Sequence, residues 1–232
     1  GEVRLDGELL SASDWRSTRA RALFFYILDH EKVRKEAIGL DFWPDFSPGK
    51  VSSNFHATLW RVRQALGHKD AIQFEDDHYS LHPEISVCSD VSEFERLIQQ
   101  STQEDLSDRG RVELLRQAIS LYSGPFLEDI YMDWVDERRD ELQADYMEAL
   151  EFLGRRRLEA QQYSEAIDLY KKIVEADPYQ DKVHLAIMEC HAKSGSPSAA
   201  RAHFQDYQQM LHDELNAEPI PALQEFIDQL DS

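Results

Sequence analysis

The residues best suited to binding chemistry lie between positions 48 and 66, where basic and aromatic side chains alternate with apolar ones. At 100° per residue, four apolar side chains share one narrow sector of a helix: Phe55, Leu59, Val62 and Leu66. The opposite sector then carries Ser53, His56, Ala57, Trp60, Arg61 and Gln64. Arginine binds the edge of guanine or a phosphate oxygen, so this outer sector is suited to a DNA groove.

The candidate DNA contacts fall into two sets. Ser53, His56 and Trp60 are expected to face the groove, with Arg61 the best candidate for a contact to guanine or phosphate. The candidates for phosphate alone are Lys50, Arg63, Arg16, Arg19 and Lys69. The alternatives are that the arginines pair with neighbouring acidic residues and that the ring of Trp60 packs on the hairpin that follows.

Motifs of catalysis and of metal binding are not found. Gly49-Lys50 lacks the remaining spacing of a phosphate-binding loop, and neither Gly-x-Ser-x-Gly nor His-Glu-x-x-His occurs. His184 and His191 are expected near one face of a helix, beside Cys190, but no third ligand completes a zinc site. We therefore expect no enzymatic activity, no cofactor and no bound metal, and we interpret Cys88 and Cys190 as buried, reduced thiols.

The elements that position the candidate residues follow from turn and helix signals. Residues 3–10 are predicted to form a hairpin around Asp6-Gly7, and a helix follows Ser13-Asp14. A short helix over 35–42 ends at Trp43-Pro44, and the candidate helix runs from Pro48 to about Leu66. A second hairpin over 71–81 has the acidic tip Glu75-Asp76-Asp77-His78.

From Asp90 onward the pattern is helical, with a 34-residue repeat. Leu153-Gly154, Ala166, Tyr170 and Pro178 have the spacing of the tetratricopeptide (TPR) pattern, and a shift of 34 residues reaches Ala200 and Phe204. Tyr163 and Tyr179 are expected to seal helix pairs. The run that contains Trp134, Asp136, Glu137, Arg138 and Arg139 is a candidate surface for a peptide, a second protomer or a polymerase.

Charge is distributed unevenly over the 232 residues, whose formal net charge is −20. Ten basic and six acidic residues give the segment from Asp14 to Lys69 a charge of +4, whereas residues 101–232 carry −15. A basic segment on an acidic chain is typical of one domain that faces phosphate and another that faces protein or solvent. With 42% hydrophobic residues and no apolar run of membrane-spanning length, the sequence predicts a cytoplasmic protein without membrane contact.

The chain resembles the Streptomyces antibiotic regulatory proteins and AfsR-like regulators over nearly its whole length. In the first half the resemblance is carried by Thr18-Arg19-Ala20-Arg21-Ala22-Leu23, Leu40-Asp41-Phe42-Trp43-Pro44-Asp45, Asn54-Phe55-His56 and Arg61-Val62-Arg63-Gln64-Ala65-Leu66-Gly67. In the second half it is carried by Asp90-Val91-Ser92-Glu93-Phe94, Leu121-Tyr122-Ser123-Gly124-Pro125-Phe126-Leu127, Asp133-Trp134-Val135, Asp177-Pro178-Tyr179 and Glu214-Leu215-Asn216-Ala217-Glu218-Pro219. The resemblance implies a mainly α fold with a small α+β part. An OmpR-like winged helix over residues 1–89 would precede a TPR-like, all-helical bacterial transcriptional activator domain over residues 90–232.

The resemblance also implies a function and its partners. A winged helix of this family would bind repeated promoter sites on double-stranded DNA, as a homodimer, and recruit RNA polymerase. A sensor, receiver or ATPase module would belong to a longer parent protein. The acidic hairpin tip departs from the family pattern, because carboxylates are repelled by phosphates. The alternative is therefore a protein-interaction adaptor whose winged helix does not bind DNA. The sequence leaves open the operator, the signal and the choice between activation and repression.

Overall fold

A computed structural model describes residues 3–5 and 8–230 of the chain. The chain forms two compact units that interleave along the sequence. We call residues 1–92 together with 123–142 the winged-helix unit, and residues 93–122 together with 143–232 the repeat unit. The two units are described separately below.

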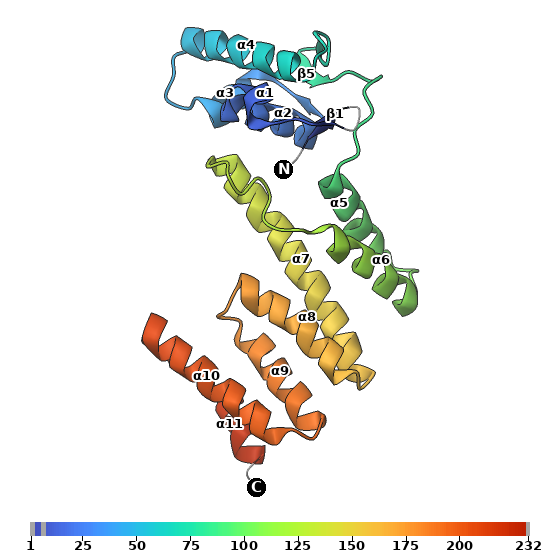
Figure 1. Cartoon of the computed structure of the whole chain (residues 1–232), viewed down its shortest axis with the longest axis vertical. Helices are drawn as coiled ribbons and strands as arrows, with labels where there is room; N and C mark the ends of the chain where they lie inside the picture. Colours follow the sequence, from blue (N-terminus) through green and yellow to red (C-terminus); the bar gives the residue numbers. More distant parts are fainter. Residues whose placement is uncertain (1–2, 6–7, 231–232) are drawn as a thin grey trace. The chain divides into compact units, whose positions relative to one another are not determined.

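In the part of the chain that the structure describes, the winged-helix unit contains small sheets, four complete helices and the first residues of two longer helices that continue into the repeat unit (Figure 1). The strands β1 (Arg4–Leu5) and β2 (Glu8–Leu9) pair antiparallel, and the expected turn at Asp6-Gly7 lies outside the described residues. The helices are α1 (Ala12–Trp15), α2 (Thr18–His30), α3 (Lys35–Phe42) and α4 (Pro48–Ala65). A three-stranded antiparallel sheet has the order β3-β5-β4, formed by β3 (Lys32–Val33), β4 (Ile72–Glu75) and β5 (His78–Leu81).

Two local features differ from the sequence prediction. The helix expected after Ser13-Asp14 is divided into α1 and α2, because Arg16 adopts a left-handed backbone conformation with φ 56°. The second helix then begins after Ser17, whose extended backbone occupies the N-cap position. The two-residue strand β3 was not predicted, since its assignment depends on pairing of Lys32 with Ser80 and of Val33 with Tyr79.

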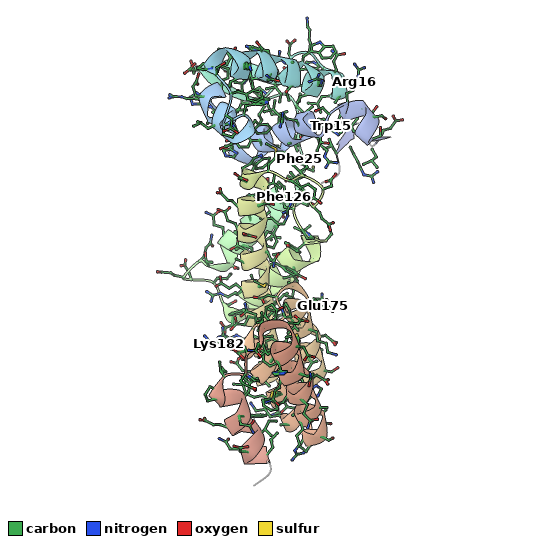
Figure 2. The ribbon with its side chains drawn as sticks, turned by 90° about the vertical axis from the view of Figure 1, so that its left-hand side faces the viewer. Trp15, Arg16, Phe25, Phe126, Glu175 and Lys182 are labelled. Carbon is green, nitrogen blue, oxygen red and sulfur yellow. The ribbon has the colours of Figure 1, made fainter. Side chains whose placement is uncertain are left out.

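The core of the winged-helix unit includes residues that lie far along the sequence. Phe126, Leu127, Ile130, Trp134 and Val135 join the apolar cluster formed by α2, α3 and α4. The ring of Trp134 lies 5.1 Å from that of Tyr26 and 6.3 Å from that of Phe42. Phe126 also meets the edge of Phe25 on α2 (Figure 2). Residues 123–142 therefore complete the hydrophobic core of this unit.

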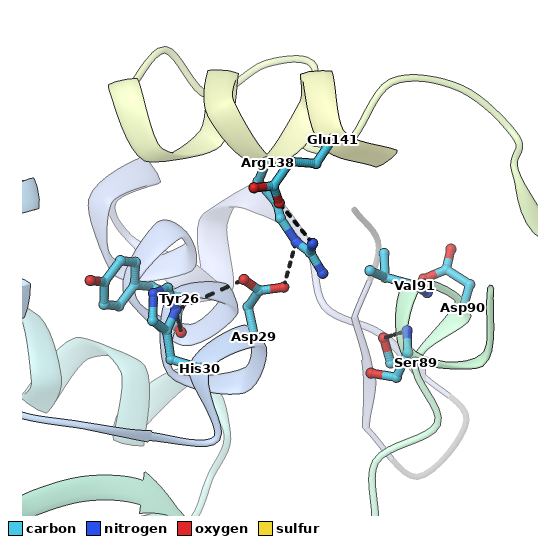
Figure 3. Close-up of polar contacts among 9 residues, drawn as sticks. Tyr26, Asp29, His30, Ser89, Asp90, Val91, Arg138 and Glu141 are labelled. Carbon is cyan, nitrogen blue, oxygen red and sulfur yellow. Dashed lines mark hydrogen bonds and ion pairs between the residues drawn. The ribbon is translucent and has the colours of Figure 1, made fainter. Parts of the chain in front are cut away.

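Polar contacts fasten the same segment to α2. The guanidinium of Arg138 donates from Nε to Asp29 Oδ1 at 2.9 Å, with both side chains 17% exposed (Figure 3). Arg21 forms an ion pair with Asp129. Within the segment, Arg139 donates to the carbonyl oxygens of Phe126 and Leu127 at 3.0 and 3.2 Å.

These contacts correct the expectation of an interaction surface in the run from Trp134 to Arg139. Trp134 is only 8% exposed, and Arg138 and Arg139 each have partners inside the unit. The three side chains are occupied by packing and by hydrogen bonds within the protein. A partner would thus meet only the exposed Asp136 and Glu137 of this run.

The repeat unit is built of successive helix pairs (Figure 1). Its helices are α5 (Asp90–Ser101), α6 (Asp108–Leu121), α8 (Tyr163–Ala176), α9 (Asp181–Lys193), α10 (Pro197–Leu215), α11 (Pro221–Leu230) and the C-terminal part of α7 (Asp133–Glu159). The first residues of α5 and α7 belong to the winged-helix unit.

The packing of the repeat residues has a clear physical basis. A Cβ built on Gly154 would lie 2.6 Å from Cε1 of Tyr170, so the two helices approach too closely for any side chain at this position. Ala166 and Ala200, the small residues one period apart, are fully buried. Tyr163 packs against the same cluster as Tyr170, and the Tyr179 hydroxyl donates to Glu214 Oε2 at 2.6 Å. The fold class expected from the sequence is confirmed.

Among the described residues, no helix is both long and apolar enough to cross a bilayer.

Candidate nucleic-acid interface

The candidate face belongs to helix α4, and local sequence determines where this helix begins and ends. Pro48 occupies the first turn, where a missing N–H costs nothing, and Gly67 follows the last turn with φ 65°. Phe55 and Val62 are fully buried against the core, and Leu59 is 3% exposed. This inward sector matches the one predicted, so the rotation of the helix about its axis is set by apolar burial.

The outer sector of α4 is open. Ser53, His56, Ala57 and Gln64 are exposed, and the ring of Trp60 is 53% exposed. Ser53 Oγ donates to the Gly49 carbonyl at 3.1 Å, and the ring of His56 meets the edge of Phe55. Arg61 is partly exposed, and no carboxylate lies within ion-pairing distance of it among the residues that the structure describes. The predicted outward side chains thus share one accessible face.

Three of the flanking cations lie over aromatic rings. The Arg16 guanidinium carbon is 5.9 Å from the ring centroid of Trp60, and that of Arg19 is 5.8 Å from the ring of Trp43. The ammonium of Lys50 lies 5.9 Å from the ring of Phe46. Lys69 is exposed beyond the C-terminal end of α4. Arg16, Trp60 and the outer sector of α4 are therefore neighbours, whereas Arg63 has a different environment.

Arg63 is partly occupied within the protein. One of its terminal nitrogens donates to the Ile72 carbonyl oxygen at 2.6 Å, which ties α4 to β4. Its Nε atom is buried without a hydrogen-bond partner. A phosphate contact by Arg63 would have to use the remaining terminal nitrogen.

The hairpin tip has a tight turn with an acidic surface. Asp76 and Asp77 have φ of 49° and 66°, the pair of left-handed conformations that a two-residue hairpin turn requires. Glu75, Asp76 and Asp77 are all exposed. Arg34, which the sequence analysis did not select, lies 4.0 Å from Asp77 and offsets part of the charge. Only the pairing of β3 with β5 brings Arg34 near the tip, so the sequence carries no local signal for it.

The histidines of the repeat unit form a buried polar network. Nδ1 of His184 lies 2.9 Å from Nε2 of His203, and Nε2 of His184 lies 2.9 Å from the Pro178 carbonyl oxygen. Burial and the neighbouring His184 and His191 lower the pKa of His203 to about 4. Burial also raises the pKa of the Cys190 thiol to about 11. Cys88 was expected to be buried as well, but it is exposed in the segment that follows β5. Among the described residues, no group of three or more His, Cys, Asp or Glu side chains could hold a metal ion.

Comparison with known proteins gives a family match, a relative by sequence and a similar solved structure. Residues 89–230 match the family model of the bacterial transcriptional activator domain. The sequence is 24% identical over 221 residues to the regulatory protein AfsR of Streptomyces griseus, which covers 94% of this chain. The structure is similar to that of Mycobacterium tuberculosis EmbR in complex with a low-affinity phosphopeptide, with a TM-score of 0.69, 17% identity and 98% of this chain covered.

The matched relatives are longer than this chain, which spans 22% of AfsR and 62% of the EmbR chain. The family match begins at residue 89, where the sequence analysis ends its first domain. The division into two domains at this boundary remains a prediction. In the structure, residues 123–142 belong to the same compact unit as residues 1–92. The resemblance that the sequence analysis identified is confirmed by the family match.

Proposed function

The chain belongs to the bacterial transcriptional activator domain family, and from this premise we propose that it regulates transcription by binding double-stranded DNA through the outer sector of α4. The family description is that of a transcriptional regulator and not of an enzyme. In this proposal α4 enters the major groove, where its side chains reach base edges, while cations at its flanks bind phosphates.

The observation that supports the proposal most directly is the accessibility of this sector. Ser53, His56, Trp60 and Arg61 lie on the side of α4 away from the core. Ser53, His56 and Trp60 are exposed, Arg61 is partly exposed, and Arg16 lies over the ring of Trp60. Residues 123–142 instead pack against the helices through Trp134 and Phe126, which contact Tyr26, Phe25 and Phe42. A guanidinium without a carboxylate partner, as in Arg61, retains its donors for DNA.

The proposal also includes partners other than DNA. We propose that the chain contacts RNA polymerase, acts as a homodimer on repeated sites and works in the cytoplasm. We also propose a longer parent protein with a sensor, receiver or ATPase module; the chain spans 22% of AfsR. The phosphopeptide named with EmbR belongs to that protein's complex.

The test is an electrophoretic mobility shift with DNA from upstream of the gene that encodes this chain, at two salt concentrations. We expect a shifted band that weakens as salt rises, because each phosphate contact releases counterions. If Arg61 contacts guanine, Arg61→Ala should weaken the free energy of DNA binding by about 1–3 kcal/mol, which is seen as a shift that requires more protein. Arg109→Ala, at an exposed arginine of the repeat unit, is the matched control and should bind as the unmodified chain does. Absence of any shift at low salt would refute the proposal.

The acidic hairpin tip favours a second candidate function, a protein-interaction adaptor that does not use DNA. Three adjacent exposed carboxylates disfavour close approach to phosphates. The double substitution Asp76→Asn and Asp77→Asn separates the two functions, since asparagine tolerates left-handed backbone conformations. DNA binding predicts an affinity that rises when the two charges are removed. An adaptor predicts no DNA binding in either form and weaker binding of its protein partner.

A further inference from the structure

The backbone at Arg16 carries an arginine where a glycine is the ordinary choice. With φ 56° and ψ −4°, Arg16 is the C-cap of α1 in the left-handed region. A residue with a Cβ pays about 1–2 kcal/mol for this conformation, and glycine is preferred at such caps. A large side chain held in an unfavourable backbone conformation suggests a role for that side chain.

The neighbours of Arg16 hold this conformation in place. Trp15 is 2% exposed, and its ring lies 5.4 Å from that of Phe24 in the core. The backbone N–H of Ser11 donates to Asp14 Oδ2 at 2.7 Å, which fixes the single turn of α1. Directly after Arg16, Ser17 occupies the N-cap position of α2, which begins at Thr18. The chain is therefore anchored on both sides of Arg16, whose side chain points outward (Figure 2).

The side chain of Arg16 lies over the exposed ring of Trp60 on α4, at 5.9 Å from the centroid. Attraction between a guanidinium and the face of a ring requires no carbonyl or carboxylate acceptor, so the N–H groups remain available as donors to a phosphate. No carboxylate lies within ion-pairing distance of Arg16 in the part of the chain that the structure describes. An oriented cation with free donors is the arrangement that a phosphate oxygen requires.

We infer that Arg16 and Trp60 act as one phosphate-binding unit beside the recognition helix, in which the indole ring orients the guanidinium toward the DNA backbone. The inference rests on the proposed DNA binding and assigns a distinct role to each residue. Arg16 contacts the phosphate. Trp60 is a positioning residue that acts through Arg16 and does not read a base.

The test compares variants whose effects on folding and on DNA binding have opposite signs. Arg16→Gly removes the backbone strain at φ 56°, so amide hydrogen exchange in α1 and α2 should slow or stay unchanged. The same substitution removes the cation, so DNA affinity should fall about tenfold. The salt dependence of log K should also lose about 0.9 in slope, the value for one phosphate contact. Gln161→Gly is the matched control, since Gln161 is exposed with φ 60° and carries no charge. It should leave the DNA affinity unchanged.

The role of Trp60 is tested by coupling. Trp60→Leu should weaken binding about two- to fivefold in the unmodified chain and have almost no effect in the Arg16→Gly background, because the ring acts through the arginine. Trp60→Phe retains an aromatic face and should recover most of the affinity. The probe is a mixed-sequence duplex of about 30 base pairs, or roughly three helical turns.

The possible results separate this inference from the function on which it rests. If the unmodified chain binds the duplex and Arg61→Ala binds more weakly, but Arg16→Gly binds as the unmodified chain does, the inference is wrong and DNA binding stands. Additive effects of Arg16→Gly and Trp60→Leu would show that the two residues act separately and would also overturn it. If the unmodified chain binds no DNA at low salt, both proposals are refuted.

Discussion

Replacing Trp134 with alanine tests whether residues 123–142 are structural members of the winged-helix unit. The side chain is 8% exposed, and its ring lies 5.1 Å from Tyr26 and 6.3 Å from both Phe42 and Phe126. Truncation of a buried tryptophan to alanine costs about 3–5 kcal/mol. The buried Nε1 atom of Trp134 has no hydrogen-bond partner, which already lowers the stability of the native state, so we expect the lower end of that range.

Hydrogen exchange measured by mass spectrometry on the full chain reads this loss separately in each unit. A loss of about 3 kcal/mol should speed exchange of the most protected α2 amides about a hundredfold, whereas amides of α9 should be unaffected. Trp60→Ala is the matched control, because its 53% exposed ring supports little of the core and surface substitutions usually change stability by at most about 0.5 kcal/mol. Wild-type exchange in α2 after Trp134→Ala would refute the structural role of the segment.

Two further predictions concern the repeat unit. Because the pKa of His203 is lowered to about 4, the folded state favours the neutral ring, and stability should be full above about pH 6.5 and fall by at most about 3 kcal/mol as the pH drops toward 4. The measurement is urea unfolding of the full chain at several pH values, with hydrogen exchange of α9 and α10 as the readout. His203→Gln should reduce the change of stability with pH, and an unchanged pH dependence in this variant would contradict the role of His203. Gly154→Ala places a Cβ 2.6 Å from the Tyr170 ring and should cost about 1–3 kcal/mol, visible as faster exchange in α8. Gly49→Ala, whose Cβ would meet nothing within 4 Å, is its control, and equal stability of the two variants would contradict the close packing.

Local sequence determines most of the elements that position the candidate site. The bounds of α3 were predicted because Trp43-Pro44 cannot continue a helix, and those of α4 because Pro48 and Gly67 mark its ends. The division at Arg16 was missed, since a left-handed arginine has no signal of the kind that a glycine or asparagine gives.

Long-range contacts account for the other differences. Trp134, Arg138 and Arg139 were predicted to form a surface because no local pattern required each of them to pack. Trp134 packs against rings on α2 and α3, and Arg138 binds Asp29 of α2, about a hundred positions away. Arg139 binds carbonyl oxygens in the loop that precedes α7. Apolar residues at 126, 127, 130, 134 and 135 were the available signal of a buried segment. The sequence alone could not indicate that its partner is the winged helix.

The central proposal is that the outer sector of α4 meets DNA, and crosslinking from that sector tests it most directly. Ala57 is small, exposed and central on this face, so Ala57→Cys can carry a photoreactive group; Cys88→Ser removes the other exposed thiol, and Cys190 is buried. Glu165→Cys, at an exposed position of α8, is the control attachment site. We predict that irradiation with the upstream DNA yields a covalent adduct from position 57 and none from position 165. Adducts from neither position under conditions where the DNA is bound, or from position 165 alone, would contradict recognition by α4.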